Sequence, residues 1–434
     1  MRYYQIRSPA LSFNGWTIAL FLVLFWSFHY TVLDVLGISP LIILCMELLA
    51  VAFALISTGR RAFSWVTPLA GWCVFLALTI RNNYYLETNQ LSRPVAYFLV
   101  FFLAYFLQFT DIWYSSLQWV MEFFVLEHFC LSWLFYFFPG FYRSQIIPLF
   151  PYITQRRLRS YQADHVLIGL TDHYSTSGIY FAIGCILFFS LWLAYKEKKR
   201  YFILFMLMLL SLMMTQKRGP LVFVMVAIVV SFFADQGIHL KSLLFFVIGS
   251  GVLAGTIVLL IQLIPQLGAV VDRFFNAGDN GRDALHRYAW ELFYMHPVFG
   301  AGFGQYRNYS KLKVSSDTEY AAHNHYLQIL SEMGVLGLTL FVLLLVAMLL
   351  LTFYAVFRIK RCSLQTSAQR QMLLFSLGMQ VYFIGYGITG NPLYDVQCFI
   401  PYFILLAVPL SYLLSVEKEK PNDESRNCNV YQDG

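Results

Sequence analysis

Apolar stretches long enough to cross a bilayer dominate this chain, and they constrain its fold more than any other feature. Of its 434 residues, 59% are hydrophobic and only 12% are charged, whereas a soluble domain has about 25% charged residues. A helix needs about 20 apolar residues to span the hydrocarbon core, and it satisfies its own backbone hydrogen bonds, as lipid requires. We therefore predict an all-α, polytopic membrane helix bundle.

The apolar runs predict about twelve transmembrane helices in a single transmembrane domain, residues 1–416. The predicted spans lie at about 14–31, 37–58, 63–80, 94–109, 116–138, 174–195, 201–216, 219–234, 242–264, 326–357, 371–389 and 398–416. The first run lacks a small-residue cleavage site, so we predict no cleavable signal peptide. The polar composition of residues 417–434 predicts a disordered tail.

Basic residues are distributed unevenly between the two sides of this bundle. Sixteen lysines and arginines share a side with the N-terminus, and four lie in short segments on the other side. Cytoplasmic loops carry such an excess, so we predict a multi-pass protein of the cell (inner or plasma) membrane with cytoplasmic termini. The other ten basic residues lie in two long outer loops, 139–173 and 266–325. They give the outer face the positive charge that would attract an anionic substrate.

One polar segment, Gln266–Tyr326, interrupts the apolar sequence for about sixty residues. Between Gly281 and His296, apolar residues recur at helical spacing, which predicts an amphipathic helix on the outer surface. Arg282 falls in its first turn, where the helix dipole disfavours a cation, so we expect Arg282 to meet a partner or a ligand. The alternative for Arg282 and Arg287 is a solvated face or one that contacts lipid headgroups.

A second basic cluster lies in the tight turn Thr215–Pro220, between two helix ends on the same outer side. Pro220 suits the first turn of the following helix, which places Lys217 and Arg218 at the start of that helix. Arg218 is a candidate anion-binding residue; the alternative is an anchor that snorkels to the membrane surface.

Two histidines lie at the end of the polar segment. His323 is a candidate proton acceptor, because imidazole titrates near neutral pH; the alternative is a structural histidine at the interface. His323 and His325 are two residues apart, so on a helix they would point to different sides. The chain has no HExxH motif and no obvious carboxylate cluster, and we predict no metal site.

Together these residues suggest one reaction. Arginine forks match phosphate oxygens, and a histidine can deprotonate a hydroxyl. Arg218, Arg282 and His323 on one outer face would be equipped to displace a diphosphate leaving group with an alcohol. The stretch Gly169–Ser175 faces the same side, so His173 or Asp172 would line an acceptor path, unless Asp172 caps the next helix.

The order of these motifs resembles the O-antigen ligase and polysaccharide polymerase family over about Leu210–Leu340. The matching pieces are Lys217-Arg-Gly219, Gly281-Arg282, His296-Pro-Val-Phe-Gly-Ala-Gly302, His323-Asn-His-Tyr-Leu-Gln328, Glu332-Met-Gly334 and Gly337. One departure is His286, which stands where members often have a tryptophan; Trp290 follows one turn later.

The resemblance implies a metal-independent glycosyltransferase without a cofactor, which uses sugars linked to undecaprenyl diphosphate at the outer leaflet. Arg218 and Arg282 would hold the donor diphosphate, and His323 would act as the base on the acceptor hydroxyl. Further substrate-binding candidates are Lys217, Arg287, Asn324, Glu332 and, from its position before the sixth span, His173.

The favoured function is therefore a polymerase that joins lipid-linked repeats during capsule, exopolysaccharide or O-antigen assembly. Its partners would be the lipid-linked oligosaccharide, an acceptor glycan, the bilayer, a flippase and a chain-length regulator, and no nucleic acid. The first alternative is a ligase that moves a finished glycan to a lipid core or a protein. A rival of another class is a transporter or flippase, which requires charges within its spans; Glu47, Glu122 and Glu127 are the main acidic residues there.

Overall fold

The computed structural model describes residues 14–58, 92–244, 281–314, 320–361 and 366–419, with scattered positions within 71–78 and 248–268. The predicted span at 63–80 and most of the span at 242–264 lie outside the described residues. So does most of the predicted tail, beyond residue 419.

Every regular element in the described part of the chain is a helix, which confirms the all-α prediction. The longer helices are α1 (Gly15–Val35), α2 (Pro40–Thr58), α4 (Ser92–Leu107), α5 (Tyr114–Phe137), α7 (Tyr152–Ala163), α8 (Tyr174–Ala194), α9 (Lys199–Met214), α10 (Arg218–Gln236), α13 (Arg282–Met295), α14 (Gln305–Val314), α15 (His325–Arg361), α16 (Ser367–Tyr386) and α17 (Val396–Glu419). Three short turns of helix, α6 (Pro139–Phe141), η2 (Tyr142–Ile146) and η3 (Ile147–Leu149), connect α5 to α7.

Seven of the described helices are long and apolar enough to cross a membrane: α1, α2, α5, α8, α10, α15 and α17. Helices α4, α9 and α16 coincide with three more predicted spans but do not meet the same criteria of length and hydropathy. The count of about twelve spans is therefore not confirmed, and it stays a prediction.

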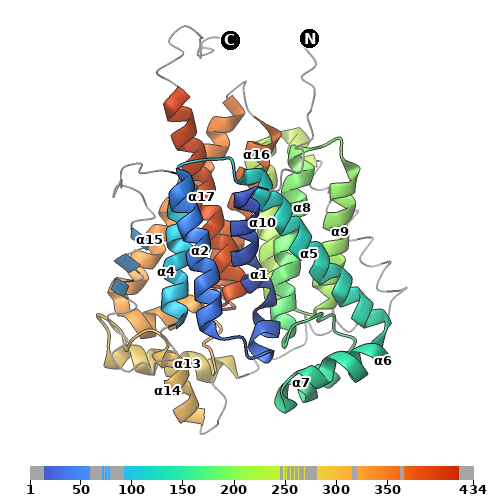
Figure 1. The fold of residues 1–434 in the computed structure, drawn as a ribbon, viewed down its shortest axis with the longest axis vertical. Coiled ribbons are helices and arrows are strands. Elements are labelled where there is room, and N and C mark those ends of the chain that lie inside the picture. Colours follow the sequence, from blue (N-terminus) through green and yellow to red (C-terminus); the bar gives the residue numbers. More distant parts are fainter. Residues whose placement is uncertain are drawn as a thin grey trace.

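The long helices run side by side along the bundle, α7 and α13 lie across one end of it, and α14 extends from the same end (Figure 1). Helices α8 and α17 form the centre, because 89% and 78% of their apolar windows are buried, against 22% in α2. Small residues let neighbouring helices approach α8 closely. A Cβ at Gly184 would lie 2.7 Å from Val125 of α5 and 3.0 Å from Met208 of α9.

At the other end of the bundle, an arginine fork joins α10 to α16. The Nε and one terminal nitrogen of Arg370 each donate to a carboxylate oxygen of Asp235 at 2.7 Å. Asp235 is only 2% exposed, and a buried carboxylate needs such a partner. Helices α10 and α16 flank the candidate site at their other ends. The fork therefore holds the two helices together at the end that is far from the site.

Helix α15 contains a kink at Gly334, whose backbone is left-handed (φ 66°). The part before the kink, from His325 to Met333, lies at the end of the bundle where α13 and α14 also lie (Figure 1). The kink therefore divides α15 into a short arm near the candidate site and a long apolar helix.

Candidate functional site

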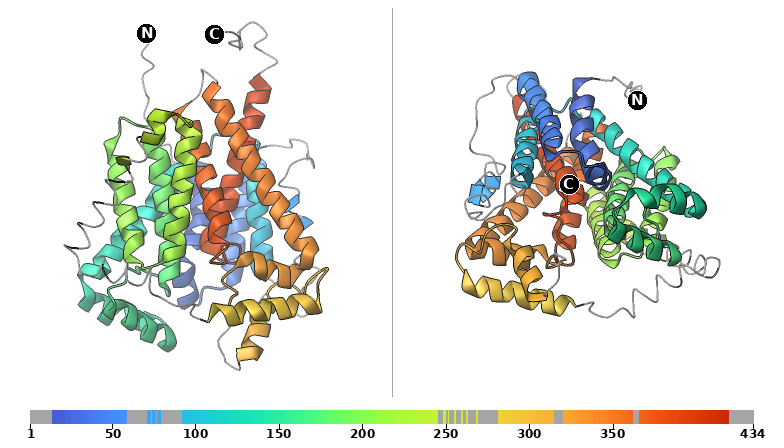
Figure 2. Two further views of the ribbon diagram at one scale, coloured as in Figure 1. Left: turned by 180° about the vertical axis from the view of Figure 1, so that it is seen from behind. Right: turned by 60° about the horizontal axis from the view of Figure 1, so that its bottom comes forward.

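Helices α8, α10, α13 and α15 begin at the same end of the bundle (Figure 1). Helices α13 and α7 lie on opposite sides of this end, as both views show (Figure 1; Figure 2). Helix N-termini carry partial positive charge and unpaired N–H groups, which favour a bound anion. The predicted site residues lie at or near these four starts.

The turn before α10 directs its successive residues toward different neighbours. Lys217 packs on α8, where a Cβ at Gly178 would lie 3.5 Å from the Lys217 Cβ, and its Nζ lies 4.1 Å from the Tyr174 ring centroid. Gly219 instead faces the end of α16, where its Cβ would lie 2.6 Å from Thr389 Oγ1. Arg218, between them, is the first residue of α10.

The helix predicted between Gly281 and His296 is present as α13. Gly281 is left-handed (φ 79°) and lets the chain turn into the helix at Arg282. Arg282 and His286 are one turn apart and therefore share a side, and the charges of both act on His323. Whether α13 lies on the outer side of a membrane stays a prediction.

Arg287 has a different environment from Arg282. It is exposed, and its charge acts on Glu291 one turn later. Glu291 also accepts bonds from Lys313 Nζ at 2.8 Å and from the Tyr309 hydroxyl at 3.0 Å. The structure thus associates Arg287 with an acidic partner on α13 and does not bring it to His323.

His323 occupies a left-handed turn (φ 54°) just before α15, and it is exposed. The surrounding protein removes part of the hydration of the His323 ring. Four nearby positive or ionisable groups also oppose its protonation: Arg282, Lys217, His286 and Arg307. These effects lower the pKa of His323 to about 4. The imidazole is therefore neutral near pH 7, as a proton acceptor must be.

Glu332 connects the elements around His323. It is fully buried, and its Oε1 accepts bonds from the Tyr306 N–H at 3.3 Å and from Gln328 Nε2 at 3.2 Å. Its Oε2 accepts a 2.6 Å bond from the Tyr394 hydroxyl. Gln328 in turn accepts from the N–H of Ala322, the residue before His323. Both carboxylate oxygens of Glu332 thus accept hydrogen bonds from other residues of the protein. This geometry favours a role in positioning the turn that carries His323, and it does not favour direct contact with a ligand.

The glycine-containing motifs also meet in space. The Ala301 and Gly302 N–H groups donate to the Ser331 and Glu332 carbonyls at 3.0 and 2.8 Å. The Val335 N–H donates to the Pro297 carbonyl at 2.9 Å. This ladder joins the segment after α13 to the kink of α15.

Gly300 makes that close approach possible. It is left-handed (φ 72°), and a Cβ there would overlap the backbone of Glu332 and Met333. The Gly300–Gly304 segment therefore packs against α15.

Asn324 and His325 have structural contacts. Asn324 Oδ1 accepts from the Leu327 N–H at 3.1 Å, which caps α15. The His325 N–H donates to the Gly387 carbonyl at 2.9 Å, and its buried ring packs on Phe341. His325 is thus directed into the bundle, away from His323.

Among the described residues, no three histidines, cysteines or carboxylates lie together as a metal site would need. Metal independence itself stays a prediction.

His173 caps α8, since its Nδ1 accepts from the Ser175 N–H at 3.1 Å. The alternative in which Asp172 caps this helix is wrong: Asp172 Oδ1 accepts a 3.3 Å bond from Thr31 of α1. Burial, followed by the charges of Lys217, Arg157 and His323, lowers the pKa of His173 to about 3. His173 therefore lies close to His323, on the side of α7.

Three charged or ionisable residues near the site were not among the sequence-based candidates: His286, Arg307 and Arg157. His286 was discernible, because it follows Arg282 by one helical turn. Arg307 acts on His323 from α14, and its Nε is buried without a hydrogen-bond partner in the described part of the chain. The position of Arg307 depends on the Gly300–Gly304 turn that precedes α14. Arg157 was treated as part of a loop, but it lies on α7.

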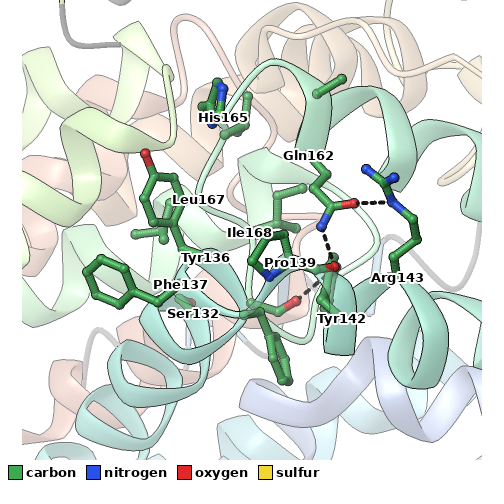
Figure 3. A pocket seen from close by; sticks show the side chains of 14 residues that line it. Ser132, Tyr136, Phe137, Pro139, Tyr142, Arg143, Gln162, His165, Leu167 and Ile168 are labelled. Atoms are coloured by element: carbon green, nitrogen blue, oxygen red, sulfur yellow. Dashed lines mark hydrogen bonds between the residues drawn. The ribbon is translucent and has the colours of Figure 1, made fainter. Parts of the chain in front are cut away.

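A groove of about 490 Å³ lies elsewhere, between the end of α5, η2 and residues 162–169 (Figure 3). Arg143 Nε donates to Gln162 Oε1 at 3.2 Å, and Gln162 Nε2 donates to the Pro139 carbonyl at 2.8 Å. The lining of this groove contains none of the predicted site residues. These bonds hold the end of α7 against α6 and η2.

Comparison with known proteins agrees with the resemblance noted in the sequence. Residues 203–342 match the family model described as O-antigen ligase. The match covers about a third of the chain, and it includes Arg218, Arg282, His323 and Glu332. No curated protein matches the chain. With its several apolar helices, the chain is a multi-pass membrane protein. About a third of it is similar to the O-antigen ligase family, and this similarity implies a glycan-transferring enzyme.

Proposed function

Because residues of an O-antigen ligase segment surround His323, we propose that this protein is a polysaccharide polymerase. It transfers a glycan from undecaprenyl diphosphate to a sugar hydroxyl at the outer leaflet, during capsule, exopolysaccharide or O-antigen assembly. The observation that carries this proposal is the neutral His323 among Arg282, Lys217 and Arg307. A base next to clustered cations suits a reaction in which a hydroxyl displaces a diphosphate.

In this proposal, Arg218 and Arg282 bind the donor diphosphate. Each is the first residue of its helix, so the backbone N–H groups and the positive helix end add to the guanidinium charge. When the bond between the sugar C1 and the phosphate oxygen breaks, its electron pair stays on the diphosphate. Positive groups that are already in place stabilise the charge that develops there.

His323 accepts the proton of the attacking hydroxyl while the new bond from that oxygen to C1 forms. In the free protein, the partial loss of hydration and then the surrounding cations keep the pKa of His323 low. A bound diphosphate would neutralise part of this positive field, and the basicity of His323 would then rise. The base therefore becomes stronger when the donor is present, which couples proton transfer to donor binding.

The proposed orientation has both termini in the cytoplasm and the site outside. Its support is the excess of basic residues toward the other end of the bundle, such as Lys196–Arg200 between α8 and α9. Two cations and a base would assist the departure of the diphosphate without a metal ion, so we propose a metal-independent reaction.

A ligase is the second candidate, since the matching family model carries that description. It would use the same donor residues and differ in the acceptor. Genes for a flippase and glycosyltransferases next to this one would favour the polymerase, whereas genes for a lipid core pathway would favour the ligase.

The test is an assay of the purified full chain with diphosphate-linked repeat units in EDTA. We expect longer saccharides on a gel and none with Arg282→Ala. Lys313→Ala is the matched control, because it removes a positive charge from the same segment at an exposed pair, which contributes little. Lipid that crosses the bilayer without a new glycosidic bond would instead support a flippase.

A further inference from the structure

A row of aromatic and basic side chains connects α7 to the site. We name this row the acceptor wall and define it as Arg157, Tyr161, His173, Tyr174 and Lys217. The His173 and Tyr174 rings stack with centroids 4.4 Å apart, and Tyr161 of α7 meets both rings edge-on, at 5.8 and 4.9 Å. Lys217 Nζ lies 4.1 Å from the Tyr174 centroid. Four of the five side chains are partly exposed, and Arg157 is exposed.

Arg157 belongs to this row by its position on α7. It precedes Tyr161 by one helical turn, so the two side chains share a side of the helix. Its charge acts on His173, and one of its terminal nitrogens donates to Thr154 Oγ1 on the same helix at 3.4 Å. Arg159, two residues later, points to a different side of α7 and is exposed.

His173 has a defined hydrogen-bonding role in the wall. Its Nδ1 accepts the Ser175 N–H, so in the neutral ring the hydrogen is on Nε2. His173 is therefore a fixed hydrogen-bond donor at Nε2 and is not suited to act as the base.

Arg157 and Tyr161 of the wall lie on α7, Arg282 lies on α13, and these two helices lie on opposite sides of this end of the bundle (Figure 1). The charges of Arg282, Lys217, His286 and Arg307 act on His323, and His323 in turn acts on His173. If the donor diphosphate lies with Arg218 and Arg282, the acceptor hydroxyl must approach the base from the wall.

The charges of the wall indicate what kind of sugar it selects. From Pro139 to Ala163 the chain contains four arginines and no aspartate or glutamate. The nearest carboxylates are Asp172, which bonds to Thr31 of α1, and Asp164, which ends α7. The faces of aromatic rings pack on the apolar C–H faces of a sugar, and an arginine fork matches a carboxylate.

We propose, on the basis of the proposed function, that the acceptor wall is the acceptor subsite and that it selects a sugar with a carboxylate. Lys217 and Arg157 pair with the carboxylate, and His173 Nε2–H donates to a neighbouring oxygen of the same sugar. The polymer made by this protein is then an acidic polysaccharide.

The test uses the full chain, the native lipid-linked donor and a lipid-free acceptor. The acceptor is the repeat-unit saccharide released by mild acid, either native or with its carboxylates reduced to alcohols. We expect reduction to raise the acceptor KM at least about tenfold and leave the donor KM unchanged, since a hydrogen bond to a charged group is lost. Arg157→Gln should raise the KM for the native acceptor similarly and have little effect with the reduced one.

Arg159→Gln is the matched control, because it removes the same charge from the same helix, and it should leave both KM values unchanged. A native repeat unit without carboxylates, or equal KM values for the two acceptors, would overturn the acceptor proposal and leave the polymerase intact. If the lipid-linked donor yields no product with either acceptor, the proposed function itself fails, and this proposal fails with it.

Discussion

At the scale of single residues, His323 and His173 lie close together but have different chemistry. His173 is fixed by the Ser175 N–H and presents a donor. His323 occupies a left-handed turn and is exposed, and the partial loss of its hydration, followed by the charges of nearby cations, keeps it neutral. The surroundings of each ring, more than its identity as a histidine, thus determine which one is suited to accept a proton.

The first prediction concerns the guanidinium of Arg218. Arg218→Lys keeps the charge but loses the planar pair of donors that matches a diphosphate. We expect kcat to fall about 10- to 100-fold, in line with the loss of one or two charge-assisted bonds in the transition state. Chain-extension rates under saturating donor would measure this fall, and full activity would remove Arg218 from the site.

The second prediction concerns pH. The neutral form of His323 is the active base, so kcat/KM should rise with pH through the free-protein pKa, about 4, and then level off. Arg282→Gln removes one of the positive charges that lower this pKa. The acid limb of that variant should therefore move to higher pH, although its maximal rate is lower.

The pH profile of kcat/KM, measured for the unchanged protein and for Arg282→Gln, would check the direction in which the acid limb moves. The control is His323→Ala, in which the acid limb should disappear along with most of the activity. An acid limb that stays in place, or moves to lower pH, in Arg282→Gln would contradict the assignment of His323 as the base.

At the scale of elements, the site depends on the contact between the segment after α13 and the kink of α15. Gly300 and Gly334 are both left-handed there, and side chains at either position would overlap the opposite backbone. Through Glu332, the same contact reaches Tyr306, Gln328 and the turn that carries His323. The helix with Arg282 and the turn with His323 are therefore held by one structural unit.

The third prediction follows from this contact. Gly300→Ala should lower the free energy of unfolding by roughly 2–4 kcal/mol, because it adds backbone strain and a steric overlap. Gly140→Ala is the matched control, since a Cβ at Gly140 would meet nothing within 4 Å. Thermal melting of both variants in detergent would compare them, and equal melting temperatures would refute the proposed role of the contact.

The sequence predicted this region in part. Helical spacing of apolar residues located α13 to within a residue, and Pro220 correctly indicated the start of α10. Local patterns cannot reveal contacts between segments distant in the chain, so the burial of Glu332, the pairing of Lys313 with Glu291 and the approach of Arg307 were not predicted. Helix α7 was missed because its few apolar residues and many arginines resemble a solvated loop.

At the scale of the whole molecule, hydropathy predicted the helical bundle and most of its long helices. Hydropathy does not fix the number of spans, because buried helices such as α16 contain polar residues that lower their mean hydropathy. The orientation in the membrane rests on the distribution of charge, which the fold alone does not fix.

The fourth prediction tests this orientation. In a variant without native cysteines, Arg159→Cys on α7 and Glu197→Cys between α8 and α9 introduce exposed thiols near opposite ends of the bundle. A membrane-impermeant maleimide should label the first in intact cells and the second only after permeabilisation. The reverse pattern would place the candidate site in the cytoplasm, where an outer-leaflet donor is absent.

The central claim is that Arg218 and Arg282 hold the diphosphate of the donor beside His323. A structure of the full chain in a lipid nanodisc with undecaprenyl diphosphate tests it most directly. We expect phosphate density within hydrogen-bonding distance of both guanidinium groups, with the His323 ring next to it. Density that contacts neither arginine, at the groove in Figure 3 or elsewhere, would contradict the account.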